Sequence, residues 1–391
     1  MPPVIIYITG FRQHAGKTVA ALGIISALKK VIDPARIGYI KPVGQEMITL
    51  ESGKRIDKDA LILKIFSGIP DLDLEYLSPV RLLPGFTRKY LDAPNRQQET
   101  AKLKAHIQSA LEQLAEKDVI IAEATGHPGV GSIVGLSNAK VSNLMKAEIV
   151  FLSGGGIGKA MDQLEVDLSY FLFKRSRVRG IIFNKVMPEK LPAMKQYINE
   201  ELINSKLDAV GAPIRVFGYI PDLPDLSKPS MQLIYRRWAQ AEALGDTDLE
   251  QWKLPCQDIK VISLPEKSLR RPAFLNAGDM VIMSSLFQTR SRSLLKFNKT
   301  LKAKGRGLGG LILTGGNYMD LDPQVKADIA ASGLPGLFVP EHTAICEEKL
   351  LKIYANTKLQ IYDKNKIMRI ESLFGEHFDL DRFMDTMNIR P

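Results

Sequence analysis

GFRQHAGKT, residues 10–18, follows the apolar run VIIYIT (4–9) and leads into a helical pattern that starts at Lys17. A strand that delivers the chain to a glycine turn, with a helix directly after it, points backbone N–H groups at a phosphate. Gly16 lets the backbone approach the phosphate, Lys17 can reach the terminal phosphates, and Thr18 offers a hydroxyl to Mg²⁺. The stretch therefore predicts a loop that binds ATP, or another nucleotide, with Mg²⁺. The alternative is a chance Gly-Lys-Thr in a lysine-rich chain, which the flanking strand and helix disfavour.

The first 220 residues alternate apolar, β-rich runs with helical patterns. The strand-like runs are 4–9, 36–43, 118–125, 148–154, 178–184 and 214–221. Near-continuous Val and Ile runs that alternate with helices are typical of a parallel sheet covered on both faces. We therefore expect an α/β fold, with a mostly parallel sheet of the P-loop NTPase type and helices on both faces.

A second α/β series begins near residue 258, after a stretch rich in Asp and Pro that has one helix-like pattern at 231–244. The strand-like runs of this series are DIKVISL (258–264), DMVIMSS (279–285), GGLILTGG (309–316) and LPGLFV (334–339). We therefore divide the chain into three parts. They are a nucleotide-binding domain at 1–225, a connector with one helix at 226–257, and a smaller α/β domain at 258–391.

The composition is typical of an ordinary globular protein, with 45% hydrophobic and 25% charged residues in a chain of 391. No apolar stretch approaches the ~20 residues of a membrane span, and the N-terminus reads as a strand instead of a signal peptide. Because of this, we do not expect a membrane partner. The two cysteines, Cys256 and Cys346, have no metal or redox spacing, which is typical of a reducing compartment, so we expect a cytoplasmic protein.

The formal net charge of +10 suits anionic ligands such as nucleotides. The most basic stretch, TRSRSLLKFNKTLKAKGR at 289–306, carries apolar residues at roughly helical spacing. We interpret it as the solvated face of a helix, with an anion or nucleic-acid surface as the alternative. Because no nucleic-acid-binding signature accompanies it, we do not expect a nucleic-acid partner.

Five residues separate Gly10 from Gly16, one more than in the commonest phosphate loop. This spacing resembles that of dethiobiotin synthetases and of the related cobyrinic acid a,c-diamide synthases. Partition-type ATPases are less similar, because they have a lysine where this chain has Phe11. The resemblance implies that nucleotide-binding residues occupy the loop and one later strand. They are Gly10, Gln13, His14, Ala15, Gly16, Lys17, Thr18 and Asn184.

Further matches to dethiobiotin synthetases follow in order: Lys41-Pro42-Val43, Asp59-Ala60-Leu61, Glu123 at a strand end and Asn184 at another. The resemblance implies that Thr18, Asp59 and Glu123 hold Mg²⁺ and that Asn184 reads adenine. It also implies that Lys17 and Lys41 neutralise the charge that develops in phosphoryl transfer. Two alternatives stay open, because Asp59 could be a helix cap and Asn184 could cap its strand.

The chain departs from this family at Arg12, where dethiobiotin synthetases carry a metal-binding aspartate. A guanidinium cannot bind a metal, but it could neutralise phosphate, stabilise transferring charge as a catalytic group, or face solvent. The substrate side differs as well, with Gly44-Gln45-Glu46 after the Lys-Pro-Val and Ala124-Thr125-Gly126-His127 after the glutamate. We therefore do not expect dethiobiotin synthesis. His127 is a candidate proton carrier or a structural loop residue.

The C-terminal part resembles the small domain named for a DRTGG signature. Leu313-Thr314-Gly315-Gly316 and Asp363-Lys364-Asn365-Lys366-Ile367 match it, whereas SSLFQTR stands where the Asp-Arg is expected. A synthetase-like P-loop domain followed by this domain is similar to the regulatory N-terminal half of long phosphate acetyltransferases. Acetyl transfer is not expected, because the sequence shows no transacetylase catalytic domain after this part. Glutaminase activity is not expected either, since Cys256 follows a proline in the connector and Cys346 lies in an apparent helix.

Two functions compete. The first is a nucleotide-binding regulatory or sensor module with slow ATPase activity, whose C-terminal domain binds a second small ligand. Gly315, Gly316 and Asn317 could form a backbone anion site there, or simply a glycine turn between strand and helix. The second is an ATP-dependent ligase, of the cyclo-ligase or amide-forming type, that activates a carboxylate. A scaffold with vestigial sites is a weaker alternative, and we expect a homo-oligomer.

Overall fold

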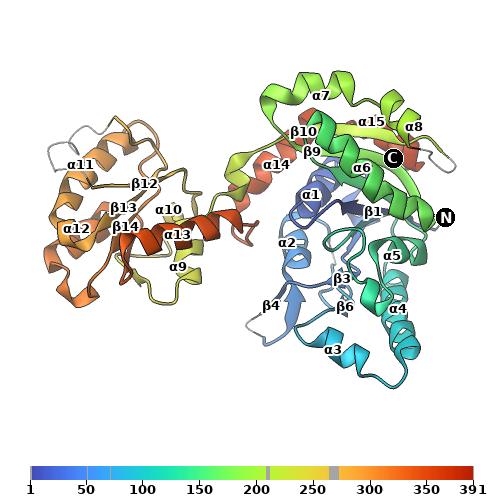
Figure 1. Ribbon diagram of the computed structural model, residues 1–391, viewed down its shortest axis with the longest axis horizontal. Coiled ribbons are helices and arrows are strands. Elements are labelled where there is room, and N and C mark those ends of the chain that lie inside the picture. The colour runs from blue at the N-terminus through green and yellow to red at the C-terminus, as the bar shows by residue number, and fades with distance from the viewer. Residues whose placement is uncertain (1, 51, 71, 208–211, 264–272, 391) are drawn as a thin grey trace. The chain divides into compact units, whose positions relative to one another are not determined.

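The computed structural model describes residues 2–50, 52–70, 72–207, 212–263 and 273–390. The chain forms two compact units, shown in Figure 1. The first consists of Met1–Asp222 together with Lys364–Pro391, and the second of Leu223–Asp363. None of the described helices has the length and the apolar character that a membrane-spanning helix needs.

The first unit is built on a six-stranded sheet in which all neighbouring strands are parallel. Its order is β10-β9-β8-β1-β7-β2, so the strand that leads into the phosphate loop lies inside the sheet. The strands are β1 (Val4–Gly10), β2 (Ile37–Ile40), β7 (Val119–Glu123), β8 (Glu148–Ser153), β9 (Arg177–Val186) and β10 (Arg215–Pro221). All six predicted strand-like runs are present, and the parallel sheet expected from them is confirmed.

Helices cover both faces of this sheet (Figure 1). The described helices of this unit are α1 (Lys17–Leu28), α2 (Lys58–Phe66), α3 (Phe86–Leu91), α4 (Arg96–Glu112), α5 (Asn138–Leu144), α6 (Ile157–Phe173), α7 (Leu191–Tyr197), α8 (Glu200–Lys206), α14 (Lys364–His377) and α15 (Leu380–Met387). Two short ladders accompany the sheet: β3 (Val43–Gly44) with β6 (Val80–Arg81), and β4 (Met47–Thr49) with β5 (Arg55–Asp57). Phe151 of β8 and Phe183 of β9 belong to one buried hydrophobic core together with Leu164 and Leu168 of α6.

The C-terminal residues return to the first unit, which differs from the predicted assignment of 258–391 to one domain. Helix α14 packs on α1, where a Cβ on Gly23 would lie only 2.1 Å from Cγ of Phe374. Asp379 then donates its backbone N–H to the carbonyl of Phe217 at 2.7 Å, at the β10 edge of the sheet. The apolar face of α14 therefore completes the core around the phosphate-loop helix.

The second unit contains a five-stranded sheet of order β11-β15-β14-β13-β12, parallel except for β11. Its strands are β11 (Glu242–Ala243), β12 (Ile259–Val261), β13 (Met280–Ser284), β14 (Gly310–Thr314) and β15 (Gly336–Val339). Its helices are α9 (Met231–Arg237), α10 (Glu250–Lys253), α11 (Ser291–Lys302), α12 (Pro323–Ser332) and α13 (Thr343–Ala355). The last residue of the predicted run 258–264 lies outside the described residues.

The stretch predicted as a connector, 226–257, belongs to the second unit and supplies part of its core. Met231 and Trp252 are buried there. The helix predicted at 231–244 ends at Arg237, because Trp238 leaves the helical conformation and its ring is buried in the same core. Within the basic stretch 289–306, helix α11 buries Leu294 and turns its charged residues outward, as the apolar spacing predicted.

Candidate functional site

The phosphate loop joins β1 to α1, and its last residue is conformationally demanding. Gly16 has a φ of 93°, and a Cβ at this position would lie 2.2 Å from Nδ2 of Asn184. Only glycine fits both the left-handed backbone and the close approach. No side chain caps the helix and no acidic residue lies in its first turn, so the N-terminus of α1 presents its positive end to an anion.

Lys17 is the first residue of α1, and its side chain spans the loop. Nζ donates hydrogen bonds to the carbonyl oxygens of Arg12 at 3.0 Å and Gly126 at 2.9 Å. The residue is only 7% exposed. The ammonium is therefore held between the loop and the segment that follows β7, by neutral acceptors that the phosphates of a nucleotide could replace.

Thr18 connects the loop to the end of β7. Its hydroxyl donates to Oε1 of Glu123 at 2.8 Å, and the hydroxyl of Tyr39 donates to Oε2 of the same carboxylate at 3.0 Å. Glu123 is the last residue of β7 and is buried. Because carboxyl ends of parallel strands meet at one edge of the sheet, side chains from β2, β7 and the start of α1 gather here.

Lys41 lies at the centre of a buried group of carboxylates. It forms an ion pair with Asp59, a second with Oδ1 of Asp57 at 3.1 Å, and a third contact with Oε1 of Glu123 at 3.8 Å. The side chains of Lys41, Asp57 and Glu123 are almost fully buried, whereas that of Asp59 is 20% exposed. One ammonium therefore faces three carboxyl groups, and the cluster can accept further positive charge.

The pKa values of these groups follow from burial and from one another. Burial raises the pKa of Glu123 to about 7, although Lys41 opposes the shift. Burial likewise raises the pKa of Asp57, again against the charge of Lys41. Burial alone would lower the pKa of Lys41, but the carboxylates of Asp59, Glu123 and Asp57 outweigh it and raise that pKa. The ammonium of Lys41 is therefore charged at neutral pH, while Glu123 changes its charge near neutral pH.

Asp57 is a member of the site that the sequence prediction missed. Its side chain caps α2 by accepting from the backbone N–H of Asp59 at 3.0 Å and of Ala60 at 3.3 Å. The open alternative for Asp59 is thereby settled, because Asp57 is the cap and the carboxylate of Asp59 pairs with Lys41. An aspartate directly before a helix start was a sequence signal for this cap.

The donor atoms at this edge fit Mg²⁺ in their chemistry. Thr18 offers a hydroxyl, and Asp59 and Glu123 offer carboxylates, all of them hard oxygen donors. Within the described ranges, no three His, Cys, Asp or Glu side chains are grouped as a metal cluster. The set resembles sites in which Mg²⁺ binds one or two carboxylates and completes its coordination with phosphate and water.

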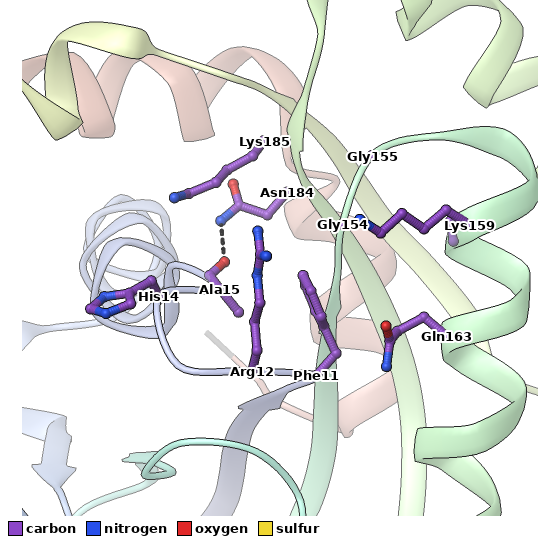
Figure 2. A pocket seen from close by; sticks show the side chains of 11 residues that line it. Phe11, Arg12, His14, Ala15, Gly154, Gly155, Lys159, Gln163, Asn184 and Lys185 are labelled. Atoms are coloured by element: carbon purple, nitrogen blue, oxygen red, sulfur yellow. Dashed lines mark hydrogen bonds between the residues drawn. The ribbon is translucent and has the colours of Figure 1, made fainter. Parts of the chain in front are cut away.

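The other side of the loop borders a pocket with a volume of about 120 Å³ (Figure 2). Arg12, predicted as a catalytic group, lines this pocket with its guanidinium 4.9 Å from the centre of the Phe11 ring. Asn184 also lines it and donates Nδ2–H to the carbonyl of Ala15 at 2.9 Å. The amide of Asn184 thus stabilises the phosphate loop through this hydrogen bond.

The remaining predicted loop residues divide between the two sides. His14 lines the pocket and has a φ of 64°, whereas Gln13 donates Nε2–H to Oε1 of Glu46 at 3.1 Å. At Gly10, a Cβ would approach Ala15 Cβ and Leu152 O to 3.1 Å, so the loop packs tightly on β8. His127 accepts from the backbone N–H of Gly129 through Nδ1 at 3.2 Å and thus stabilises a turn.

In the second unit, the glycines after β14 form a turn that the side chain of Asn317 stabilises. Gly315 and Gly316 have φ values of 80° and 86°, and Asn317 Oδ1 accepts from the backbone N–H of Met319 at 2.9 Å. Both cysteines are buried, and burial raises the pKa of Cys346 to about 12. A thiolate nucleophile is therefore disfavoured at Cys346.

Comparison with known proteins gives one family match. A model of the AAA domain family (AAA_26) matches residues 5–230, a range that contains the phosphate loop and nearly all of the six-stranded sheet.

Three solved structures with similarity to the chain share about 15% or less of its sequence. One is the MinC:MinD cell division protein complex of Aquifex aeolicus, with 15% identity and a TM-score of 0.33 over 57% of this chain and 83% of that chain. Another is the septum site-determining protein MinD of Pyrococcus horikoshii with Mg-ADP, with 14% identity and a TM-score of 0.32 over 57% and 83%. A third is the signal recognition particle receptor FtsY of Elizabethkingia anophelis with GDP, with 14% identity and a TM-score of 0.29 over 47% and 49%.

Proposed function

The chain belongs to the AAA domain family, and we propose that its P-loop domain binds Mg-ATP as a regulatory or sensor module with slow ATPase activity. The proposal is supported by the convergence of Lys17, Thr18 and Glu123 at one edge of the parallel sheet. We place the protein in the cytoplasm. Another nucleoside triphosphate would satisfy the same groups, because they recognise phosphate and metal instead of a base.

The binding step uses the groups that the loop holds in place. The ammonium of Lys17 would exchange the carbonyls of Arg12 and Gly126 for phosphate oxygens, which are better acceptors because they are charged. Backbone N–H groups at the start of α1 would bind the same phosphates. Thr18, Asp59 and Glu123 would hold Mg²⁺, which neutralises phosphate charge when it is bound.

The surroundings of Lys41 are the reason why we propose slow ATP hydrolysis instead of efficient phosphoryl transfer. A lysine that stabilises phosphoryl transfer must direct its charge at the transferring group. Lys41 is instead surrounded by Asp57, Asp59 and Glu123, and these carboxylates raise its pKa. Arg12 adds a positive charge to the loop but cannot bind Mg²⁺. Both features favour nucleotide binding over efficient transfer.

An ATP-dependent ligase that activates a carboxylate is the second candidate. The observation in its favour is that Lys41 and Asp59 form their ion pair beside the phosphate loop, at the edge where a second substrate would meet the terminal phosphate. If Mg²⁺ took over the carboxylates, the ammonium of Lys41 could turn to that substrate.

A regulatory role also needs a connection to a second ligand, for which we propose the DRTGG-like second unit. That unit ends at Asp363, and the chain continues without a break into α14, which packs on the helix that begins with Lys17. A ligand that shifts α14 would alter nucleotide affinity, and nucleotide would alter the affinity for that ligand by the same factor. Formation of a homo-oligomer belongs to the same proposal.

Phosphate release from Mg-ATP tests the choice between these functions. We expect slow turnover that stays unchanged when ammonia and a panel of small carboxylic acids are added. A stimulation by one acid, with ADP and an acyl product formed in equal amounts, would instead establish the ligase.

A further inference from the structure

Among the described residues, those that line the pocket beside the phosphate loop include three cations and no carboxylate. Its lining includes Arg12 from the loop, Lys159 from α6 and Lys185 from β9. Figure 2 shows the side chain of Arg12 extending from the loop, with Lys185 and Lys159 coming from different elements around it. Among the residues that the structure describes, none of these three cations forms an ion pair with an acidic side chain. Three elements thus bring unpaired positive charge to one small pocket.

The backbone around the pocket adds to this positive character. Helix α6 begins beside the pocket after Gly154 and Gly155, and it has neither a side-chain cap nor an acidic residue in its first turn. The positive end of its dipole is therefore not neutralised by the helix itself. A Cβ on Gly155 would lie 2.8 Å from Cα of Val186, so the start of the helix lies close against β9.

Lys185 is held in a costly conformation. Its φ is 58°, a left-handed value that is unfavourable for a residue with a side chain. Partial burial lowers the pKa of its ammonium, Asp222 opposes that shift, and Arg12 adds to it. The fold thus accepts both backbone strain and repulsion between like charges at this position. A bound anion would relieve the repulsion.

The phosphates of the nucleotide do not account for this charge. The groups proposed to bind them, Lys17 and Thr18, point toward Gly126 and Glu123 on the β7 side of the loop. The cationic pocket lies on the other side, between the loop and the ends of β8 and β9. The loop therefore separates a carboxylate-rich side that suits Mg²⁺ from a cationic side that suits an anion.

We infer that this pocket binds a phosphoryl group additional to the 5′ polyphosphate chain, carried by the ribose of the nucleotide or by a separate small ligand. The inference rests on the proposed nucleotide site. Lys159, Lys185 and the first turn of α6 would contact the phosphoryl oxygens, and Arg12 would neutralise the group from the loop side.

Calorimetric titrations at one ionic strength test this inference. The first arm compares ADP with ADP that carries a 3′-phosphate or a 2′-phosphate on its ribose. The second arm titrates inorganic phosphate into protein that is already saturated with ADP. We expect either a phosphorylated ADP that binds about tenfold more tightly than ADP, or saturable phosphate binding to the ADP complex. The first result assigns the group to the nucleotide, and the second assigns it to a separate ligand.

The variant that tests the pocket is Lys159→Met combined with Lys185→Met. The double variant should lose most of the tenfold preference for phosphorylated ADP over ADP, or bind phosphate about tenfold more weakly in its ADP complex. Lys190→Met, at an exposed lysine outside the pocket, should keep the preference or the phosphate affinity of the natural protein. The inference is overturned if ADP binds but neither arm shows an additional phosphate. It is equally overturned if the double variant weakens ADP and phosphorylated ADP by the same factor, because the lysines then serve the polyphosphate chain. A wild-type protein that does not bind ADP at all would overturn the proposed nucleotide site, and this inference with it.

Discussion

The hydroxyl of Thr18, the second residue of α1, donates a hydrogen bond to Oε1 of Glu123 at the end of β7. This contact of 2.8 Å joins residues 105 positions apart and fixes the phosphate loop against the neighbouring strand. We propose that the hydroxyl oxygen of Thr18 and the carboxylate of Glu123 both bind Mg²⁺ when nucleotide is present. A substitution of Glu123 should therefore affect Mg²⁺ binding without removing the phosphate contacts of the loop.

Glu123→Gln should reduce the contribution of Mg²⁺ to nucleotide binding while leaving metal-independent binding in place. The amide keeps one oxygen but loses the negative charge that attracts the ion. We expect the affinity for ATP to rise at least about tenfold with Mg²⁺ in the natural protein and to change little in the variant. Titrations with and without Mg²⁺ measure this, with the exposed Glu112→Gln as the control. An unchanged Mg²⁺ effect in Glu123→Gln would remove Glu123 from the metal site.

The stability of the metal-free protein should depend on pH through Glu123. Its pKa is raised from 4.5 to about 7, so the folded state holds a proton that the unfolded state releases earlier. The contribution of Glu123 to the free energy of unfolding therefore falls as the pH rises between these values, and it is constant above about 7. Asp57 acts in the same direction, while Lys41 titrates above this window.

Urea denaturation at several pH values, without Mg²⁺, measures this effect as a difference. Glu123→Gln cannot ionise, so its free energy of unfolding should rise relative to that of the natural protein as the pH increases from about 5 to about 7. A difference between the two proteins that is independent of pH, or that has the opposite sign, would contradict the assignment.

The C-terminal helix should stabilise the nucleotide-binding unit. Phe374→Ala removes a fully buried ring that packs over Gly23 of α1, and we expect a loss of about 3–5 kcal/mol in the free energy of unfolding. Phe173→Ala, at a ring that is 77% exposed, should change it by no more than about 0.5 kcal/mol. Equal losses in the two variants would show that α14 does not pack as described.

Both cysteines should be slow to react in the native protein. Cys256 is buried with its thiol 3.8 Å from the carbonyl of Gly309, and burial raises the pKa of Cys346 to about 12. Because the thiolate is the reactive form, iodoacetamide should modify both residues at a measurable rate only after unfolding. Mass spectrometry locates the modified residue. Rapid modification of either cysteine under native conditions would reopen the possibility of a nucleophilic thiol.

The sequence predicted the principal residues of the site because they stand at strand ends. Lys17, Thr18, Lys41, Asp59 and Glu123 each follow or end a run that could be recognised as a strand, or begin a helix, and parallel strands place such positions along one edge. The structure joins the side chains of Thr18, Glu123, Lys41 and Asp59 in one cluster, while that of Lys17 spans the loop from Arg12 to Gly126. Their roles in binding and transfer stay predictions.

Other features carried no comparable signal. Tyr39 lies inside an apolar strand and reads as a core residue, yet its hydroxyl reaches Glu123. Lys159 and Lys185 come from separate elements, and only the tertiary fold brings both to the pocket beside the loop. The apolar pattern of α14 showed that one face is buried but not against which domain, so the return of 364–391 to the first unit was missed.

The most direct test of the account is equilibrium binding of Mg-ATP to the natural protein and to Lys17→Met. The lysine forms charge-assisted hydrogen bonds to phosphate, so the variant should bind roughly 10- to 100-fold more weakly, while Lys89→Met on the exposed face of α3 should bind normally. Circular dichroism should show all three proteins folded. Absence of binding in the natural protein, or equal affinity in Lys17→Met, would contradict the central claim that GFRQHAGKT forms a nucleotide site.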